Sequence, residues 1–210
     1  MFPEVIETDR LRFERLDDDH VDVFELYAVA SAPEMDDVFR YVPWERHQTV
    51  RDAAEYVDEA MERWESGETA EYVVRPRSGE DGAGEFAGVA LLDPEWDRQS
   101  AQLAIWLAKQ FWGRGYSEER ATAFLALAFD RLDLDLVAVT HNVDNDNSRQ
   151  AIETYVHRFG GRREGVLRNW KAYGGSVNDE VRYTIAQDEW MANRPDEPTV
   201  DMIDEARKDG

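Results

Sequence analysis

The sequence predicts a mixed α/β fold, with strands and helices in one layered domain, from three observations. Strand-like and helix-like apolar patterns alternate along the chain. Across residues 101–132, an alternating apolar run passes through a glycine-containing turn into a helical apolar pattern. The chain has 210 residues, 42% of them hydrophobic, and no cysteine, so it can bury a large core without disulfides. We therefore expect one domain over residues 1–190.

The first half of the chain contains three predicted strands and two predicted helices. Thr49 suits the N-cap of the second helix, because its hydroxyl can accept a bond from a free amide, and Gly67 suits the end of that helix. Between the two helices, the apolar segment 31–48 is long for a simple connection, so it either covers a site or packs on the core. The predicted strands are 11–16, 71–75 and 85–92; the first helix follows an acidic cap at 17–19 and runs through Ala30, and the second lies between Thr49 and Gly67.

The second half repeats this alternation of strands and helices. Leu103, Ile105 and Leu107 alternate as they would on the better-buried face of a strand, and Gly160 with Gly161 suits a helix end. The predicted strands are 101–108, 134–140 and a final hairpin of 165–173 and 180–187 around Gly174–Gly175; the predicted helices are 121–132 and 147–158; residues 191–210 form an acidic tail, frayed or separately docked.

Residues 110–117, Gln-Phe-Trp-Gly-Arg-Gly-Tyr-Ser, lie between a strand and a helix and are suited to bind a pyrophosphate. The first amides of a helix have no internal partner, and the macrodipole is positive there. Gly113 and Gly115 lack the Cβ atoms that would keep phosphate oxygens away, and Arg114 adds a positive charge. An ordinary tight turn is the alternative. The loop is not a P-loop, because no Gly-Lys-Ser/Thr follows, and a dinucleotide fingerprint would need a third glycine at Glu118.

This loop resembles the Arg/Gln-x-x-Gly-x-Gly/Ala signature of the GNAT superfamily, the acetyl-CoA-dependent N-acyltransferases, through Gln110, Gly113 and Gly115. Further segments are similar, in the same order, to the branch of ribosomal-protein alanine N-acetyltransferases, called the Rim type. The resemblance implies the GNAT fold, a twisted mixed sheet flanked by helices, with central strands that splay apart. The segments that carry it are 8–16, 111–116, 145–148 (Asn-x-x-Ser), 163–168 (Arg-Glu-Gly-Val-Leu-Arg) and 188–190.

The resemblance also implies how acetyl-CoA, the acyl donor, is held. The loop would bind its pyrophosphate, and its pantetheine would lie in the gap between the splayed strands, paired with backbone as another strand would be. Asn145 and Ser148 would form the far wall of the gap, although both residues could also simply cap a helix. The residues expected to bind acetyl-CoA are Trp106, Leu107, Gln110, Phe111, Trp112, Gly113, Arg114, Gly115, Tyr116, Ser117, Asn145 and Ser148.

The expected chemistry is direct acetyl transfer to an amine. The amine must lose a proton and the departing thiolate must gain one. The branch often carries a glutamate base where this chain has Gln102, and an amide cannot accept a proton at neutral pH. The base must therefore be Glu95, Asp97 or water. The proton donor is Ser148 or Tyr155, and Ser148 is preferred because an extra helical turn before Gly160 displaces Tyr155 from the family's tyrosine position.

The resemblance favours a protein N-terminal amine as the acceptor, with a polyamine, amino acid or aminoglycoside as the alternative. A non-catalytic acyl-CoA-binding module is a third reading, because the family's base is missing at Gln102. Homodimers recur in this branch. The four histidines have no ligand spacing, so no metal is expected. We expect a cytoplasmic protein that inserts in no membrane, since no apolar stretch is long enough and the first residues are acidic.

The net charge of −22 arises from 46 acidic and 24 basic residues, and only Lys109, Lys171 and Lys208 are lysines. Such self-repulsion strains a compact fold unless salt screens it, so we interpret the chain as adapted to molar salt in a halophile. A docking face for a basic partner is the alternative, but the acidic residues are spread along the whole chain. Nucleic acid is not an expected partner, because its phosphates would be repelled.

We predict that thermal stability rises steeply with potassium chloride concentration. Between about 0.1 M and about 1 M the Debye length falls from about 10 Å to about 3 Å, so the acidic surface repels itself less. The measurement is the melting temperature by calorimetry over this range. A melting temperature that does not change with salt would contradict adaptation to salt and favour a dedicated acidic docking face.

Overall fold

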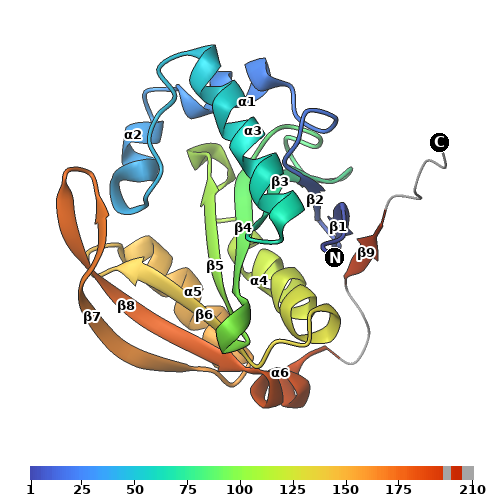
Figure 1. Ribbon diagram of the computed structural model, residues 1–210, viewed down its shortest axis with the longest axis vertical. Helices are drawn as coiled ribbons and strands as arrows, with labels where there is room; N and C mark the ends of the chain where they lie inside the picture. The colour runs from blue at the N-terminus through green and yellow to red at the C-terminus, as the bar shows by residue number, and fades with distance from the viewer. Residues whose placement is uncertain (196–199, 205–210) are drawn as a thin grey trace.

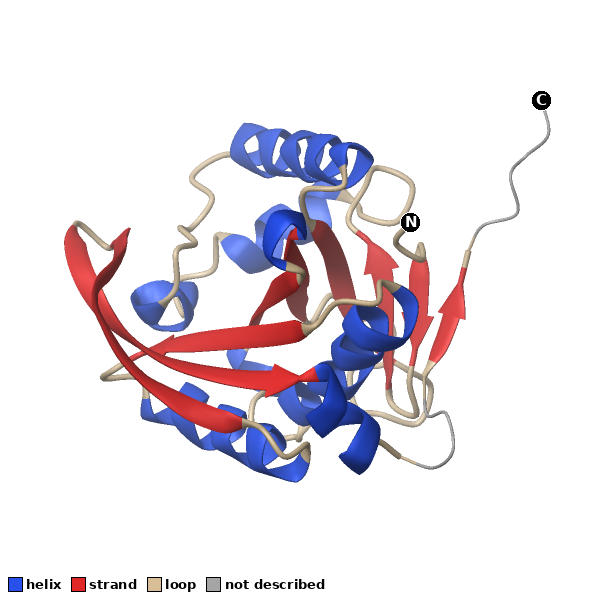
Figure 2. Ribbon diagram, turned by 60° about the horizontal axis from the view of Figure 1, so that its bottom comes forward, coloured by secondary structure: helices blue, strands red, loops and turns tan. Residues whose placement is uncertain are grey.

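The structure, a computed structural model, describes residues 1–195 and 200–204. These residues form a mixed sheet of nine strands with the order β7-β8-β6-β5-β4-β3-β2-β1-β9, flanked by helices (Figures 1 and 2). The predicted mixed α/β fold is confirmed. The strands are β1 Val5–Glu7, β2 Leu11–Arg15, β3 Ala70–Pro76, β4 Gly88–Glu95, β5 Ser100–Leu107, β6 Leu136–Asn142, β7 Arg162–Tyr173, β8 Ser176–Ala186 and β9 Asp201–Ile203.

The helices divide between the two faces of the sheet. Helices α1 and α3 pack on each other, with α3 over β3, whereas α4 and α5 pack on each other against β2, β5, β6 and β8. None of the described helices is both long and apolar enough to cross a membrane. The helices are α1 Val23–Ala30, α2 Met35–Val38, α3 Val50–Ser66, α4 Tyr116–Ala126, α5 Asp146–Arg158 and α6 Gln187–Asn193.

Two hydrophobic clusters, one on each face, hold these layers together. Because successive side chains of a strand point to opposite faces, β3 sends Tyr72 and Val74 into one cluster and Val73 into the other. The larger cluster lies under α4 and α5 and includes Phe124 and Tyr155. The smaller cluster lies under α1 to α3. The sheet is thus buried on both faces, which is what a helix-flanked sheet requires.

The central pair of strands, β5 and β6, is the only parallel pair among the described residues and is paired over a short length. Pairing runs from Ser100 opposite Leu136 to Leu103 opposite Val139 and then stops. Beyond that point β5 stays paired with β4 as far as Leu107, and β6 stays paired with β8. The two halves of the sheet therefore diverge, as Figure 1 shows, and the expected splay is confirmed.

Local signals account for the ends of α3. Thr49 and Asp52 form a capping box in which each side chain accepts a bond from the other residue's backbone amide. At the other end, Gly67 adopts φ +73° and its amide bonds to the last turn. Both predictions for this helix are confirmed.

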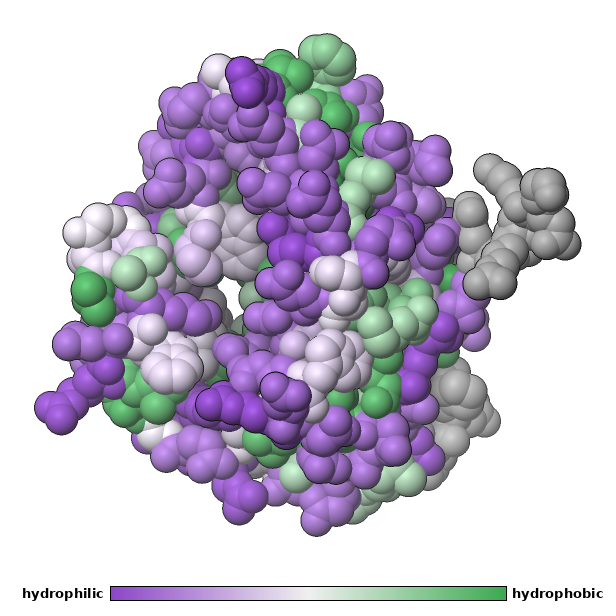
Figure 3. Space-filling view, in the orientation of Figure 1, coloured by the Kyte–Doolittle hydropathy of each residue, from purple (hydrophilic) through white to green (hydrophobic). Residues whose placement is uncertain are grey.

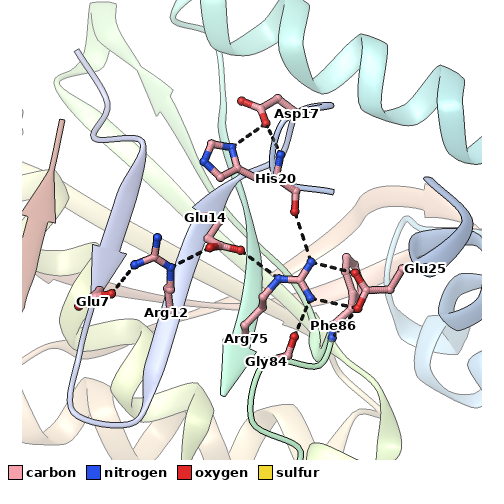
Figure 4. A network of polar contacts seen from close by, with 9 residues as sticks. All are labelled: Glu7, Arg12, Glu14, Asp17, His20, Glu25, Arg75, Gly84 and Phe86. Atoms are coloured by element: carbon pink, nitrogen blue, oxygen red, sulfur yellow. Dashed lines mark hydrogen bonds and ion pairs between the residues drawn. The ribbon is translucent and has the colours of Figure 1, made fainter. Parts of the chain in front are cut away.

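An ion-pair network joins the first three strands to α1 (Figure 4). Its centre is Arg75 of β3, whose side chain is only 14% exposed. Its Nε donates to Glu14 at 3.0 Å, and its Nη1 and Nη2 donate to the two carboxylate oxygens of Glu25 at 3.0 and 2.8 Å. Glu14 in turn accepts from Arg12 at 2.7 Å. Arginine forks of this kind fix geometry as well as charge.

Several elements were not predicted from the sequence. Strand β1 and helix α6 are additional, and β9 pairs antiparallel with β1, so part of the predicted tail extends the sheet. The remaining tail residues, 196–199 and 205–210, lie outside the described residues. The helix predicted over 121–132 begins earlier, at Tyr116, and ends in a π-helical turn over Leu127–Arg131.

Candidate functional site

The glycine loop leaves β5 and leads into α4 with its amides open. A 3-10 turn covers Lys109–Phe111, and Gly113 and Gly115 adopt φ of +74° and +79°. This left-handed conformation favours glycine, so the backbone itself requires glycine at both positions, in addition to the clearance expected from the sequence. No amide of residues 113–117 donates a hydrogen bond to any described residue. Five consecutive amides at a helix start therefore remain available to an anion.

The space above these amides is clear. A Cβ built on Gly113 would meet no atom within 4 Å, and one built on Gly115 would meet only Nη2 of Arg10, at 3.4 Å. The half-buried Ser117 lies in the first turn of α4. The loop can thus receive a bulky anion without moving its backbone.

The chain start holds this loop in position. Arg10 donates through its amide and Nε to the two oxygens of Glu119, at 2.8 and 2.7 Å, and through Nη1 to the carbonyl of Arg114 at 2.8 Å. Thr8 donates its hydroxyl to the same Glu119 at 2.6 Å. This anchor joins residues more than 100 positions apart, and reasoning from the sequence did not find it.

Side chains of the loop are engaged by the acidic segment between β3 and β4. Gln110 donates to Glu85 at 3.2 Å, and Arg114 contacts the carbonyl of Asp81 at 2.7 Å and its carboxylate at 3.3 Å. Tyr116 bonds to Glu80 at 2.7 Å, and burial raises the pKa of its phenol, with this carboxylate adding to the effect. The guanidinium of Arg114 is therefore already partnered, and an incoming phosphate would compete with Asp81 for it.

Beside the loop, the open edge of β5 begins at Ala104. The amide of Ala108 bonds to Ala87 of the β4 side, so the backbone groups of Leu107 face the gap, because neighbouring residues of a strand point to opposite sides. The exposed Trp112 donates its indole N–H to the Leu107 carbonyl at 2.7 Å. By the same alternation, Ile105 also faces the gap.

Trp106, expected to pair with the acyl donor through its backbone, lies differently. Its carbonyl oxygen abuts the Cα of Gly88 in β4, where a Cβ would not fit. Its ring packs edge-on against Phe39 at 5.3 Å and beside Phe86 at 5.8 Å. Trp106 is thus a buried residue of the smaller core, and Ile105 with Leu107 supplies the backbone groups on the open side.

The face of the sheet that α3 covers carries a cavity of about 520 Å³, close to the point where pairing between β5 and β6 ends. Residues of β3, β4 and β5 line the cavity on the side of the sheet, and α3 with the segment before it lines the opposite side. In Figure 3 an opening passes between the β7–β8 side and the β4–β5 side of the molecule. The lining residues are Pro43, Trp44, Glu45, His47, Tyr56, Glu59, Arg63, Thr69, Glu71, Leu91, Asp93, Gln102, Leu103, Ala104 and Lys171. The long segment 31–48 therefore both walls this cavity and packs on the smaller core.

Glu71 is a fixed charge in this cavity. Its carboxylate accepts from Tyr56 at 2.7 Å and from Arg63 at 3.0 and 2.6 Å. Burial raises the pKa of Tyr56 far above its usual range, and the charge of Glu71 adds to this. With its oxygens occupied, Glu71 has a structural role rather than that of a free base.

Two cavity carboxylates, Asp93 and Glu45, have no hydrogen bond or ion pair to a described residue; Glu45 is exposed, whereas Asp93 is half-buried. It sits directly opposite Gln102 in the β4–β5 register. Burial raises its pKa, as do the charges of Glu95, Glu68 and Glu71, while Lys171 opposes them. A carboxylate whose pKa is raised is better suited to accept a proton near neutral pH. Analysis of the sequence missed Asp93, because only the register reveals that it faces Gln102.

Three other side chains are candidates for the base: Glu95, Asp97 and His47. Glu95 accepts from the Gln102 amide at 3.1 Å and pairs with Arg98 at 2.6 Å, so its oxygens are engaged. Asp97 is exposed, in the turn between β4 and β5, and does not line the cavity. His47 lines the cavity with a buried, unpartnered Nδ1, and burial lowers its pKa.

The two candidate proton donors occupy different environments. Asn145 accepts from the amide of Ser148 at 3.1 Å and thereby caps α5, which leaves the half-buried Ser148 in the first turn after β6. Tyr155 is fully buried beneath α4, with the guanidinium of Arg120 5.8 Å from its ring centre and no hydrogen bond to its hydroxyl. Burial raises its pKa. Of the two, Ser148 lies close in the chain to the end of β6, the strand that borders the gap.

Comparison with known proteins agrees with this geometry. The family model described as "Acetyltransferase (GNAT) domain" matches residues 10–155. The "Putative ribosomal N-acetyltransferase YdaF" of Bacillus subtilis (strain 168) is 32% identical over 96 residues, which are 46% of this chain and 50% of that protein. The match thus spans about half the length of this relative.

Two solved structures show the same fold. RimL, described as a ribosomal L7/L12 alpha-N-protein acetyltransferase in complex with coenzyme A, superposes with a TM-score of 0.74 at 18% identity, over 89% of this chain and 99% of that chain. A spermidine N-acetyltransferase from Vibrio cholerae, in complex with CoA and spermine, superposes with a TM-score of 0.67 at 18% identity, over 86% and 98% of the two chains. At these identities the likeness concerns the fold alone.

We predict that Gly115→Val lowers affinity for coenzyme A at least about tenfold, because valine is strained at this φ and would turn the loop amides away. Titration calorimetry with coenzyme A is the measurement. Gly174→Val is the matched control, since Gly174 also has a positive φ, of +61°, and lies at the tip of the β7–β8 hairpin. Unchanged affinity in a folded Gly115→Val protein would remove the loop from the binding site.

Proposed function

Since the chain belongs to the GNAT acetyltransferase family, whose domain model matches residues 10–155, we propose that it transfers an acetyl group directly from acetyl-CoA to a primary amine. The observation that carries the proposal is the gap between β5 and β6, which we call the fork. Its closed end is where pairing stops, at Leu103 opposite Val139, and an acid-lined cavity lies there. Five free loop amides lie at its open end. The first choice of acceptor is a protein N-terminal amine.

In this proposal the two substrates approach from opposite faces. The pyrophosphate binds at the N-terminus of α4, and the pantetheine arm follows the unpaired edge of β5 past Leu107 and Ile105. The amine enters the cavity under α3, lined by Gln102 and Ala104. The reacting atoms then meet where pairing between β5 and β6 ends. Holding both reactants at one place supplies much of the catalysis, because their encounter becomes intramolecular.

The amine must be deprotonated before it attacks the thioester carbonyl. Gln102 cannot take this proton, but the carboxylate opposite it in the register, Asp93, can. As the carbon–nitrogen bond forms and the carbon–sulfur bond breaks, the thiolate must be protonated. We assign this role to Ser148, because Tyr155 is buried between helices. The free backbone N–H groups of β5 are suited to stabilise the oxyanion.

Two acceptor classes fit the cavity, and the comparisons offer a precedent for each. The name of YdaF and the description of RimL point to ribosomal proteins, and the spermidine enzyme to polyamines. Four acidic residues line the cavity, Glu45, Glu59, Glu71 and Asp93, and these favour a cationic acceptor of either class. We place the protein N-terminus first because YdaF is named a putative ribosomal N-acetyltransferase and RimL is described as an alpha-N-protein acetyltransferase. The net charge of −22 supports adaptation to molar salt, so the reaction is best assayed there.

The proposed function is tested by an acceptor panel with labelled acetyl-CoA in about 1 M potassium chloride, the concentration at which the Debye length is about 3 Å. We expect transfer to peptides with a free N-terminus and less transfer to polyamines, amino acids and aminoglycosides. The matched peptides with blocked N-termini should receive no label. Transfer to no acceptor, although coenzyme A binds, would favour a non-catalytic binding module.

Replacing Asp93 tests the assignment of the base. Asp93→Asn should lower kcat at neutral pH by about 10²-fold or more, with the affinity for coenzyme A unchanged. Because the pKa of this carboxyl is raised, it is protonated below that pKa and cannot accept a proton, so the rate should rise with pH through the raised value. The Asp93→Asn variant should not show this rise of kcat with pH. The measurement is the pH profile of kcat for the preferred amine.

Three variants serve as controls for this assignment. Glu95→Gln removes the same charge from the neighbouring carboxylate, and His47→Gln removes the cavity imidazole whose Nδ1 has no partner; both should retain most activity. Gln102→Glu combined with Asp93→Asn moves the carboxylate one strand across and should restore part of the rate. If kcat of Glu95→Gln or His47→Gln falls as far as is expected for Asp93→Asn, the role of general base belongs to Glu95 or His47 instead. Ser148→Ala, measured alongside, should lower kcat without changing coenzyme A affinity.

A further inference from the structure

A lysine of the chain itself reaches the cavity where we place the acceptor amine. Lys171 lies on β7, yet it lines the cavity together with Gln102 and Ala104 of β5. Its Nζ is 3.4 Å from the hydroxyl of Thr140, the first residue of β6 beyond the paired stretch. The ammonium group therefore lies at the closed end of the fork.

A bulge directs this side chain toward the fork. Between Leu167 and Lys171, β7 advances four residues while β8 advances two, from Glu180 to Asn178. Within the bulge, Asn169 has φ +53°, and its amide bonds to the carboxylate of Asp179 at 2.8 Å. Bulges re-aim side chains at functional sites, and this one is stabilised by its own hydrogen bond.

The electrostatic surroundings of Lys171 differ from those of a surface lysine. Lys109 is exposed and forms an ion pair with Asp37. Lys171 forms no ion pair with any described carboxylate, and among the described residues its side chain has a polar contact with Thr140 alone. The nearby carboxylate that senses its charge is Asp93, whose pKa it lowers against the effect of burial. A lysine amine and a free carboxylate thus share the cavity.

We propose that Lys171 is an intramolecular acetyl acceptor, modified by the acetyl-CoA bound to its own chain when no external amine fills the cavity. The inference rests on the proposed function, because it uses the same acyl donor and the same fork. It adds a modification site and a second fate for the acetyl group.

The step balances with the groups already described. The Lys171 ammonium gives a proton to Asp93, and the neutral Nζ attacks the thioester carbonyl. A carbon–nitrogen bond forms, the carbon–sulfur bond breaks, and the thiolate leaves with a proton from Ser148. The attacking nitrogen loses its second proton, which restores the hydroxyl of Ser148. The proton on Asp93 goes to water, and the products are an acetylated Lys171, coenzyme A and one proton.

The modification would close the acceptor cavity. The acetyl amide is larger than the ammonium group and fills space beside Gln102 and Ala104. It also removes the only cavity cation that is not committed to a carboxylate, since Arg63 is paired with Glu71. An external amine then finds its place occupied, so acetylation acts as a brake when acetyl-CoA accumulates without acceptor.

The test is mass spectrometry of the full chain incubated with acetyl-CoA alone, followed by peptide mapping. We expect a single acetyl group on Lys171, formed at least about tenfold faster than on Lys109, because Lys171, unlike Lys109, lines the cavity beside the thioester. The rate per molecule should not change with protein concentration. Lys171→Arg should gain no acetyl group under the same conditions, and Gly115→Val should be modified more slowly at subsaturating acetyl-CoA.

A second measurement follows the consequence for the enzyme. Wild-type protein incubated with acetyl-CoA before the acceptor is added should lose transfer activity in proportion to acetylated Lys171. Lys171→Arg should show no such loss relative to the same variant assayed fresh.

Different results separate this inference from the proposed function. Transfer to an external amine with Lys171 unmodified would overturn the inference and leave the function intact. Equal acetylation of Lys109 and Lys171 would indicate uncatalysed chemistry, and a rate per molecule proportional to protein concentration would indicate transfer between copies; either overturns the intramolecular step. Absence of transfer to Lys171 and to every external amine, with coenzyme A bound, would remove both.

Discussion

The early end of pairing between β5 and β6 is the constraint on which the rest of the site depends. Four residue pairs join the two halves of the sheet, and beyond them β5 and β6 each pair, among the described strands, only with their outer neighbour. Unpaired backbone groups in a buried sheet are costly unless a ligand or a side chain satisfies them. The indole of Trp112 already satisfies one of them, the carbonyl of Leu107. The remaining free edge is what a strand-like pantetheine arm could complete.

This geometry requires that the gap be held open from outside. On one face, Arg10 and Glu119 tie the start of α4 to the turn between β1 and β2, so the loop amides keep their direction. On the other face, α3 is fixed over the cavity through the bonds from Tyr56 and Arg63 to Glu71. Both anchors are charged, and their carboxylates are poorly exposed, at 15% for Glu119 and 4% for Glu71; such groups hold geometry through directional hydrogen bonds.

Much of the fold could be predicted from the sequence, because its signals are local. The capping box at Thr49, the left-handed Gly67 and the glycine loop act within a few residues, and each was found. Pairing of β9 with β1 and the contact of Arg10 with Glu119 join distant segments, and no local pattern encodes them. The direction of the Trp106 backbone, toward β4 rather than toward the gap, has the same origin. Which backbone groups face the gap depends on register, and a shift of one residue reverses the answer.

Register also supplies the proposed site with a base although Gln102 replaces a glutamate. On neighbouring antiparallel strands, residues directly opposite each other are close enough to serve the same point in space. A carboxylate at Asp93 can therefore act on the amine that a carboxylate at Gln102 would have served. The side-chain amide of Gln102 donates a hydrogen bond to Glu95 and keeps that carboxylate engaged beside the cavity. Burial raises the pKa of Asp93, and the negative charge of Glu95 raises it further. A second carboxylate at position 102 would raise that pKa further by like-charge repulsion, so the glutamine leaves one carboxylate to titrate at this point rather than a coupled pair.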